Sequence, residues 1–472
     1  MSSNEKSPYK HQKSNINTPQ QFELSASEIS ASNLIYGLYD KPPLKETIIA
    51  ALQHFLTSFI GIVSFYPILG SALGLASETI AYLISMSLIV SGFSTFIQAK
   101  TIGPIGSGLL SIQGSSVVFL GPSIAIGTAA IANGLTPEEA LATLLGLSFF
   151  ASFVEIFLSQ LIQTIASVIT PLVMGTVITM LGLTLVKVAI MAIGGGQEAI
   201  QNGTFGAYQN LLLAGLVLLT IIGFNCSQKP WFRMLSVSIG LAVGYFVALI
   251  MGRVDLSIVG QVSAFTLPQP FKFGFGFDPE AFITFSFLFV ITTIETIGDL
   301  SVTMAVTNEP IRGEKYIRRL KGGILGDGFN SLLAACFNTL PNTTYSGNNG
   351  IIQITGVASR YVGYFIAALF VLAGLFPIVG AVVQTIPQSV LGGAILILFG
   401  SVAVAGIRIL STIEFTQRSL IILATSFGLG FGVVYMPEIL DQLPTFLQDI
   451  LSSGINTAGL SALLLDAILP DT

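Results

Sequence analysis

Apolar residues dominate the chain from Lys45 to its end, whereas residues 1–44 are polar and rich in Ser, Asn, Gln and Lys. Short groups of Pro, Gly and charged residues interrupt the apolar part at intervals. A helix needs about 20 residues to cross a bilayer, and a span with its loop takes roughly 30, so the pattern predicts about fourteen transmembrane segments. They are expected at 46–70, 78–99, 105–130, 138–160, 166–193, 210–226, 234–252, 280–300, 322–340, 343–358, 361–383, 388–405, 419–436 and 450–469.

Composition indicates the same class of protein. Charged residues make up 9% of the chain, hydrophobic residues make up 52%, and the mean hydropathy is +0.81. Soluble proteins carry roughly 25% charged residues, so a water-soluble enzyme and a disordered chain are both disfavoured. The net charge of −5 and the lack of a basic patch argue against a nucleic-acid partner. We expect an all-α polytopic membrane protein in the lipid bilayer.

Basic residues follow the positive-inside rule for an even number of spans. With both termini in the cytoplasm, all but three of the 19 Lys and Arg residues fall on the cytoplasmic side. The exceptions are Lys187, Arg253 and Lys272. No apolar core lies within about the first 30 residues, where a secretory signal would have one, so residues 1–44 are expected to form a cytoplasmic tail.

Two of the expected spans are poor helices, because residues 103–122 and 341–350 are rich in Gly, Pro, Asn, Ser and Thr. Irregular backbone at membrane depth is tolerated only inside protein or beside a water-filled cavity. These are the third and tenth segments, which lie half the protein apart and would enter from opposite faces. Paired broken segments of this kind indicate an inverted repeat and the binding site of a transporter. The alternative is a pair of packing segments that bind no ligand.

Acidic residues within the spans are the main candidates for chemistry, because such groups are costly in a membrane and usually face a functional cavity. Glu295 and Asp299 are four residues apart in the eighth segment and share one helix face. His54 lies in the first segment and is expected to reach these acids. Glu155 and Asp327 are expected to be structural, Glu155 bonding to Ser152 and Ser159 on its own face and Asp327 pairing with the basic loop 312–321. Two cysteines and two histidines make a metal site unexpected.

Several motifs resemble the nucleobase–ascorbate transporter family along nearly the whole chain. Residues 348–356 (NNGIIQITG) are similar to the family signature of Asn, any residue, Gly, four residues and Thr. Residues 295–299 (ETIGD) and 113–116 (QGSS) resemble the family motifs of the eighth and third spans. Residues 34–43 and 355–360 are similar to the bacterial xanthine permease branch.

The resemblance implies a seven-plus-seven inverted repeat with short strands in the third and tenth segments. A core domain would comprise residues 45–163 and 280–385, and a gate domain would comprise 164–279 and 386–472. Family members are proton–nucleobase symporters of the bacterial inner membrane, and they need no cofactor beyond the proton gradient. They form homodimers through the gate domains and move the core by an elevator mechanism.

The resemblance also assigns roles to individual residues. Glu295 would accept hydrogen bonds from the base, while His54, Asp299 and Asn349 would support proton coupling and the core network. Asn348 would fix the strand of the tenth segment. The base would be lined by Gly347, Asn348, Ser116, Val117, Val118 and Phe119.

Two positions depart from the purine-permease pattern. Gly347 stands where the family usually has Gln, Glu or Pro, and Val118 stands where related permeases often have a polar residue. Xanthine is the first candidate by branch, and urate, hypoxanthine, guanine and uracil remain open. Three different classes of protein compete with a nucleobase permease. They are an anion transporter of the sulfate-permease type, which the acid pair disfavours, a membrane-embedded enzyme, for which no nucleophile–base pair is found, and a channel.

Overall fold

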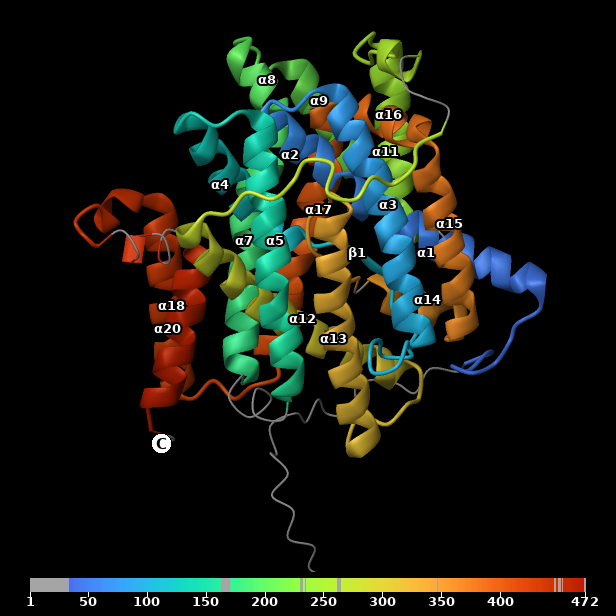
Figure 1. Ribbon diagram of the computed structural model, residues 1–472, viewed down its shortest axis with the longest axis vertical. Helices are drawn as coiled ribbons and strands as arrows, with labels where there is room; N and C mark the ends of the chain where they lie inside the picture. Colours follow the sequence, from blue (N-terminus) through green and yellow to red (C-terminus); the bar gives the residue numbers. More distant parts are fainter. Residues whose placement is uncertain are drawn as a thin grey trace, which may run out of the picture.

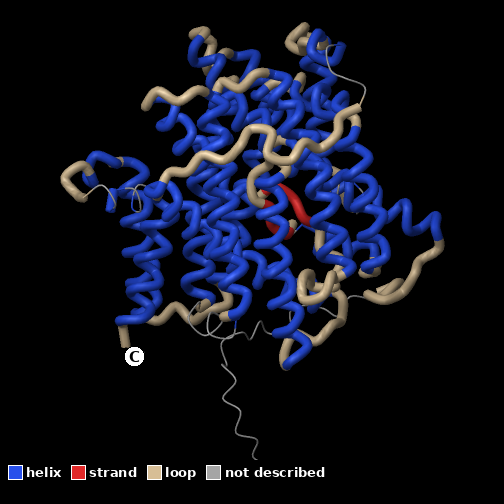
Figure 2. Tube along the Cα trace, in the orientation of Figure 1, coloured by secondary structure: helices blue, strands red, loops and turns tan. Residues whose placement is uncertain are grey.

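The computed structural model describes residues 34–470 apart from 163–169, 230–231, 234, 261–264, 346, 445–446, 449–450 and 452. Most of the expected tail, residues 1–33, lies outside this range, as does the boundary expected between residues 163 and 164. Long helices surround two short strands that lie in the middle of the bundle (Figures 1 and 2).

The elements up to residue 260 are α1 (Leu44–Val63), α2 (Phe65–Leu73), α3 (Ser77–Lys100), β1 (Gln113–Ser115), η2 (Val117–Phe119), α4 (Leu120–Ala132), α5 (Pro137–Gln160), α7 (Pro171–Ile193), α8 (Gly196–Gln201), α9 (Tyr208–Asn225), α11 (Ser236–Ile250) and η3 (Ser257–Gly260). The remaining elements are α12 (Pro279–Val306), α13 (Glu314–Cys336), β2 (Asn342–Thr344), α14 (Gly347–Thr355), α15 (Arg360–Leu375), α16 (Pro377–Gln384), α17 (Gln388–Leu410), α18 (Gln417–Tyr435), η4 (Pro437–Leu440) and α20 (Gly454–Ile468).

In the described part of the chain, eight helices are long and apolar enough to cross a membrane, or nine when α15 and α16 are counted as one bent span. The chain is therefore an all-α multi-pass membrane protein with two short strands. Each expected segment coincides with a helix or with a strand followed by a short helix.

Several boundaries differ from the expectation, since α12 and α17 continue to Val306 and Leu410, beyond the expected 300 and 405. The helix expected at 322–340 begins at Glu314, because Tyr316, Arg319 and Leu320 are buried and extend it beyond the apolar stretch. The segment expected at 361–383 bends by 77° between α15 and α16. The break lies at Pro377, which has no backbone N–H to continue the helix.

The order of elements around the two strands is repeated. Two helical segments, a strand, a short helix and a long helix follow one another as α1/α2, α3, β1, α4 and α5, and again as α12, α13, β2, α14 and α15. The packing is reciprocal, because α3 packs on α15 while α13 packs on α5. An exchange of this kind is expected when two halves of a chain are related by an approximate two-fold axis.

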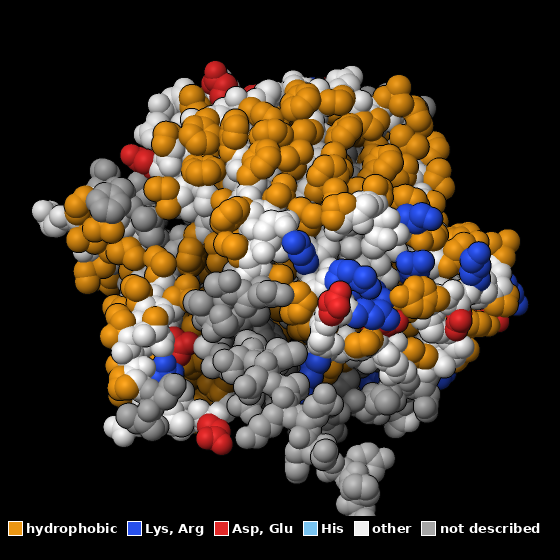
Figure 3. Space-filling view, turned by 60° about the horizontal axis from the view of Figure 1, so that its bottom comes forward, with side chains coloured by type: hydrophobic (Ala, Val, Ile, Leu, Met, Phe, Trp, Pro, Cys, Tyr) orange, Lys and Arg blue, Asp and Glu red, His pale blue; other side chains and the backbone are white. Residues whose placement is uncertain are grey.

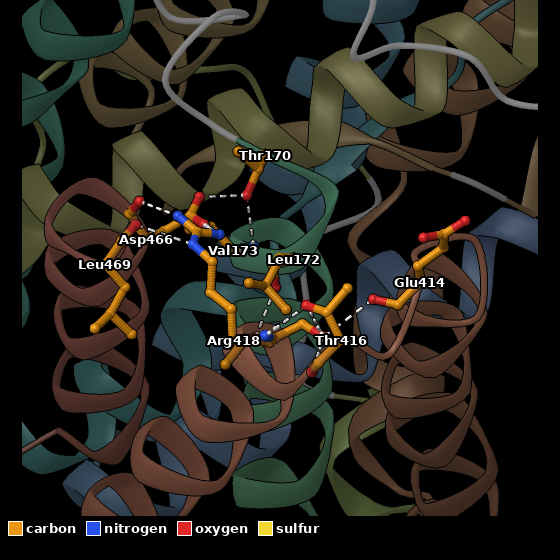
Figure 4. Close-up of polar contacts among 10 residues, drawn as sticks. Thr170, Leu172, Val173, Glu414, Thr416, Arg418, Asp466 and Leu469 are labelled. Atoms are coloured by element: carbon orange, nitrogen blue, oxygen red, sulfur yellow. Dashed lines mark hydrogen bonds and ion pairs between the residues drawn. The ribbon is translucent and has the colours of Figure 1, made fainter. Parts of the chain in front are cut away.

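Helices α7, α9, α11, α17, α18 and α20 form the other part of the bundle, in which α17 packs along α7 and α18 packs on α20. A polar junction ties three of these helices together (Figure 4). Arg418 of α18 forms an ion pair of 2.8 Å with Asp466 of α20 and donates to the Leu469 carbonyl. Thr170, the residue before α7, donates to the other oxygen of Asp466 at 2.7 Å.

Residues 34–40 lie beside the segment that links α14 to α15, and we call them the N-terminal strap. Tyr36 forms a parallel bridge with Val357. The Tyr36 and Leu38 carbonyls accept the N–H groups of Ala358, at 2.9 Å, and Arg360, at 3.1 Å. The last part of the expected tail is therefore docked against the transmembrane bundle.

Candidate functional site

The two broken segments meet through their strands, which lie at the centre of the bundle (Figure 2). Strands β1 and β2 are antiparallel and fully buried, with Gln113 opposite Thr344 and Ser115 opposite Asn342. Pairing satisfies backbone groups that no water reaches at membrane depth. A half-helix, α4 or α14, follows each strand after a short connection.

Glu295 lies on α12 and is half-buried, and its Oε2 atom is buried with no hydrogen-bond partner in the described part of the chain. Gly298, one turn further along α12, has open space around it, because a Cβ added there would meet no atom within 4 Å. The same holds at Gly347, the first residue of α14. The Oε2 atom of Glu295 is thus an unsatisfied acceptor on the helix turn before Gly298.

Two asparagines connect α14 to its neighbours. Asn348 is buried and donates from Nδ2 to the Leu110 carbonyl, just before β1. Asn349 donates from Nδ2 to the Asp299 carboxylate at 3.1 Å and accepts from Thr303 Oγ1 at 2.7 Å. The tenth segment is therefore held both to the third segment and to α12. Asp299 and Asn349 thus belong to one hydrogen-bond network. This network also includes Thr303, which the sequence did not suggest.

His54 lies on α1 and is fully buried, and its imidazole faces the Asn348 side chain. Both of its ring nitrogens are without a hydrogen-bond partner among the described residues. The expectation that His54 would bond to the acids of α12 is wrong, because α14 lies against α1 and places Asn348 beside the imidazole.

The residues that follow β1 are packed tightly. Ser116 is buried, its N–H donates to the Pro341 carbonyl at 2.8 Å, and its Oγ has no partner in the described chain. Val117 is half-buried, whereas Val118 and Phe119 are fully buried. The Phe119 ring contacts Phe289 of α12, with 4.9 Å between ring centroids. The side chains of Val118 and Phe119 thus pack into the core.

Two tyrosines beside the strands were missed by sequence reasoning. The Tyr345 hydroxyl donates to the Ser115 carbonyl at 3.1 Å, and the Tyr66 and Ser115 hydroxyls are hydrogen-bonded at 2.8 Å. The Tyr345 ring covers Gly61 and Gly114, at 2.7 and 2.8 Å from the places where a Cβ would stand. Tyr345 could have been identified from the sequence by its position in the broken tenth segment, directly after β2.

Both partner assignments for the remaining acids are wrong. Asp327 is fully buried and accepts hydrogen bonds from Gln98 and Thr296, not from the basic loop 312–321. Glu155 accepts from Thr292 and Thr293 of α12, at 3.4 and 3.5 Å. Its expected partners Ser152 and Ser159 instead donate to carbonyls of their own helix, α5. Two basic residues of the loop 312–321, Lys315 and Arg319, instead form ion pairs with Glu309.

Paired broken segments inside a helical bundle, with unpartnered polar atoms around them, define a membrane transporter with a central binding site. A family model described as "Permease family", of the xanthine and uracil permeases, matches residues 45–439. The chain belongs to the xanthine/uracil permease family, so it is a transporter and not an enzyme. The family resemblance of its motifs is confirmed.

Curated relatives cover almost the whole chain. "Xanthine permease XanQ" of Escherichia coli K12 is 44% identical over 441 residues, which cover 93% of this chain and 95% of the relative. "Xanthine permease XanP" of the same organism is 43% identical over 440 residues, with 93% and 95% coverage. "Xanthine permease" of Bacillus subtilis is 32% identical over 425 residues, with 90% and 93% coverage.

Solved structures with a similar fold have much lower identity. The transmembrane domain of a cyanobacterial bicarbonate transporter, BicA, matches with a TM-score of 0.59 at 15% identity and covers 88% of this chain and 100% of that domain. The structure of SLC26A9 matches with a TM-score of 0.59 at 12% identity and covers 90% and 66%. At this identity, the likeness establishes the fold alone.

Proposed function

We propose that the chain is a proton-coupled symporter that imports a purine nucleobase, with xanthine as the first candidate, across the plasma membrane. Three relatives that align over nearly their whole length are named xanthine permeases. The observation that carries the proposal is the buried, unpartnered carboxylate oxygen of Glu295, on a helix whose next turn has open space at Gly298. Purine bases present N–H donors in one plane, and a carboxylate accepts such donors strongly in a dry site.

The base is placed between α12 and the strand ends of the broken segments. Glu295 accepts its N–H groups, and the backbone from Ser116 to Phe119, together with Gly347 and Asn348, lines the rest of the site. Proton coupling runs through His54, Asp299 and Asn349. The hydrogen bonds that join Asp299, Asn349 and Thr303 support this part of the proposal, because a proton bound at Asp299 would change how α14 is held.

The proposed architecture has fourteen segments in two inverted halves of seven. Residues 45–163 and 280–385 form a core domain, and residues 164–279 and 386–472 form a gate domain that makes a homodimer. The core moves past the gate as an elevator with both chain termini in the cytoplasm. The repeated order of elements and the reciprocal packing of α3, α5, α13 and α15 support two related halves.

The test is uptake of a labelled nucleobase panel in permease-deficient cells that express the wild type or Glu295→Gln. The substitution keeps the shape of the side chain and removes its charge. We expect xanthine uptake by the wild type and at least a tenfold loss in the variant, with equal amounts of both proteins in the membrane. Wild-type uptake by Glu295→Gln would remove this residue from the site.

The second candidate is an anion transporter, because the fold is shared with a bicarbonate transporter. A fixed carboxylate beside the site repels an anion, so the Glu295 position argues against this candidate. Uptake of bicarbonate or sulfate, with no uptake of any nucleobase in the panel, would favour the anion transporter over the nucleobase symporter.

A further inference from the structure

Basic side chains gather on the end of the molecule that carries the expected cytoplasmic loops, with few acidic side chains among them (Figure 3). Four basic residues lie close together here, namely Arg319 and Lys315 of α13, Arg360 at the start of α15 and Lys41 next to the N-terminal strap. Lys315 and Arg319 share Glu309, Arg319 and Arg360 both contact Tyr39, and Lys41 lies over the Tyr361 ring. The patch lies where the strap meets the ends of both broken segments. None of these four residues has a role in the proposed transport reaction.

Arg319 is the buried member of the patch, with a relative exposure of 7%. Its Nη1 atom donates to the Ser107 carbonyl at 3.0 Å, and its Nη2 atom donates to the Tyr39 hydroxyl at 2.9 Å. Its Nε atom is buried and has no hydrogen-bond partner among the described residues. One donor of this guanidinium group is therefore unsatisfied in a place closed off from most solvent.

Arg360 approaches the same place from the other side. Its guanidinium lies over the Tyr39 ring at 5.0 Å from the centroid. The Arg319 and Arg360 Nη1 atoms both approach Gly108, at 3.5 and 3.9 Å from where a Cβ would stand. Gly108 has φ of +70°, so the loop turns here without a side chain that would separate the two guanidinium groups.

The negative charge around these groups is too small to balance them. Glu309 pairs with Arg319 at 3.2 Å, but it also pairs with Lys315 at 2.6 Å. The Asp40 carboxylate accepts a hydrogen bond from the Gly37 N–H. Arg360 is also the first residue of α15, and a helix N-terminus carries partial positive charge that disfavours a cation. The first N–H groups of α15 are already bonded, that of Arg360 to the Leu38 carbonyl and that of Tyr361 to Ser359 Oγ, so the helix end favours an anion only through its partial positive charge.

We propose that the Arg319 and Arg360 side chains bind a phosphate-type oxyanion beside the start of α15 on the cytoplasmic face, from an anionic phospholipid headgroup or from soluble phosphate. Guanidinium groups match the tetrahedral oxygens of phosphate with paired N–H donors. Basic clusters at the cytoplasmic membrane surface also attract anionic lipids. The bound oxyanion neutralises the two guanidinium groups and joins the N-terminal strap, α13 and α15 at the end of the core.

The test is thermal unfolding of the full-length protein in detergent, with inorganic phosphate or short-chain phosphatidylglycerol added at constant ionic strength. Arg360→Gln removes a side chain that contacts the Tyr39 ring and leaves the backbone bond to Leu38 intact. Arg408→Gln is the matched control, because it removes one exposed cation from the same predicted side at the end of α17. Arg360→Lys keeps the charge and removes the paired donors.

We expect phosphate or the lipid to raise the unfolding temperature of the wild type and of Arg408→Gln. Arg360→Gln should need about tenfold more ligand for the same shift, and Arg360→Lys should fall between them. A response to the lipid alone assigns the site to a headgroup, and a response to phosphate alone assigns it to a soluble ion. No response in the wild type, or equal responses in wild type and Arg360→Gln, would overturn the proposal.

Discussion

At Gly347 the backbone does not require glycine, because its φ lies outside the left-handed region and a Cβ would meet no atom within 4 Å. A larger residue at this position would therefore have room for its side chain. We expect Gly347→Ala to fold normally and to keep the substrate preference of the wild type. If glycine were needed for the backbone instead, Gly347→Ala would reduce membrane levels as strongly as a larger residue.

Gly347→Gln should act differently, because the longer side chain fills the open space and offers an amide to the base. One added hydrogen bond corresponds to a change of roughly 2–10-fold in KM. We expect a lower KM for xanthine and weaker uptake of larger bases, measured by competition across the nucleobase panel. Identical profiles for the wild type, the Ala variant and the Gln variant would show that this position does not set specificity.

Sequence reasoning named candidate site residues, but it did not give their packing partners. Glu295 and Asp299 could be identified because acids stand out in an apolar chain, whereas Asn348 and Asn349 were expected through the family resemblance. The hydrogen-bond partners of Asp327 and Glu155 and the side chain beside His54 could not be identified, because each comes from another helix of the bundle. Residues one helical turn away are the only neighbours that the sequence reveals. They do not predict which side chains of other helices will pack against a given residue.

At the scale of helices, the apolar runs predicted the segments because each must span a similar thickness of bilayer. They could not give the start of α13, since its first turns are amphipathic and leave the apolar stretch. They also missed the bend at Pro377, because a proline within an apolar run kinks some helices and ends others. The two strands were expected only through the family resemblance.

The junction of Arg418, Asp466 and Thr170 holds α18, α20 and α7 together (Figure 4). Asp466→Asn replaces the ion pair by a neutral contact and leaves the positive charge of Arg418 without the carboxylate of Asp466. We therefore expect a loss of about 1–3 kcal/mol in stability. The measurement is the unfolding temperature of the purified protein, with exposed Asp441→Asn as the control. The KM for xanthine should stay unchanged in both variants, and a changed KM in Asp466→Asn alone would contradict a purely structural role.

For the whole molecule, the proposed elevator requires the core and gate to slide past each other. Ser238 of α11 donates to the Leu56 carbonyl of α1 at 3.2 Å, which is a contact between the two proposed domains. We expect a cross-link between Leu56→Cys and Ser238→Cys, made after Cys226 and Cys336 are replaced by Ser, to stop uptake. Reduction of the cross-link should restore it, while each single-cysteine variant stays active. Full uptake by the cross-linked protein would contradict movement at this contact.

Proton coupling is also a property of the whole molecule. An inward proton gradient should drive accumulation of the base, so we expect uptake to rise as the external pH falls. An ionophore that collapses the gradient should abolish accumulation. Uptake that ignores both conditions and follows sodium would show that another ion drives transport.

The pairing of β1 with β2 has a consequence for how the protein is made. The Tyr345 hydroxyl that caps this pairing meets Ser115, which is synthesised 230 residues earlier. At about 5–20 residues per second, roughly 10–50 s pass before β2 follows β1 out of the ribosome. During that time the backbone of β1 has no strand partner, and lipid offers none. We therefore expect the third segment to stay in contact with water or with other protein until the second half of the chain is synthesised. Only then can its backbone groups pair with β2 and enter the bilayer interior.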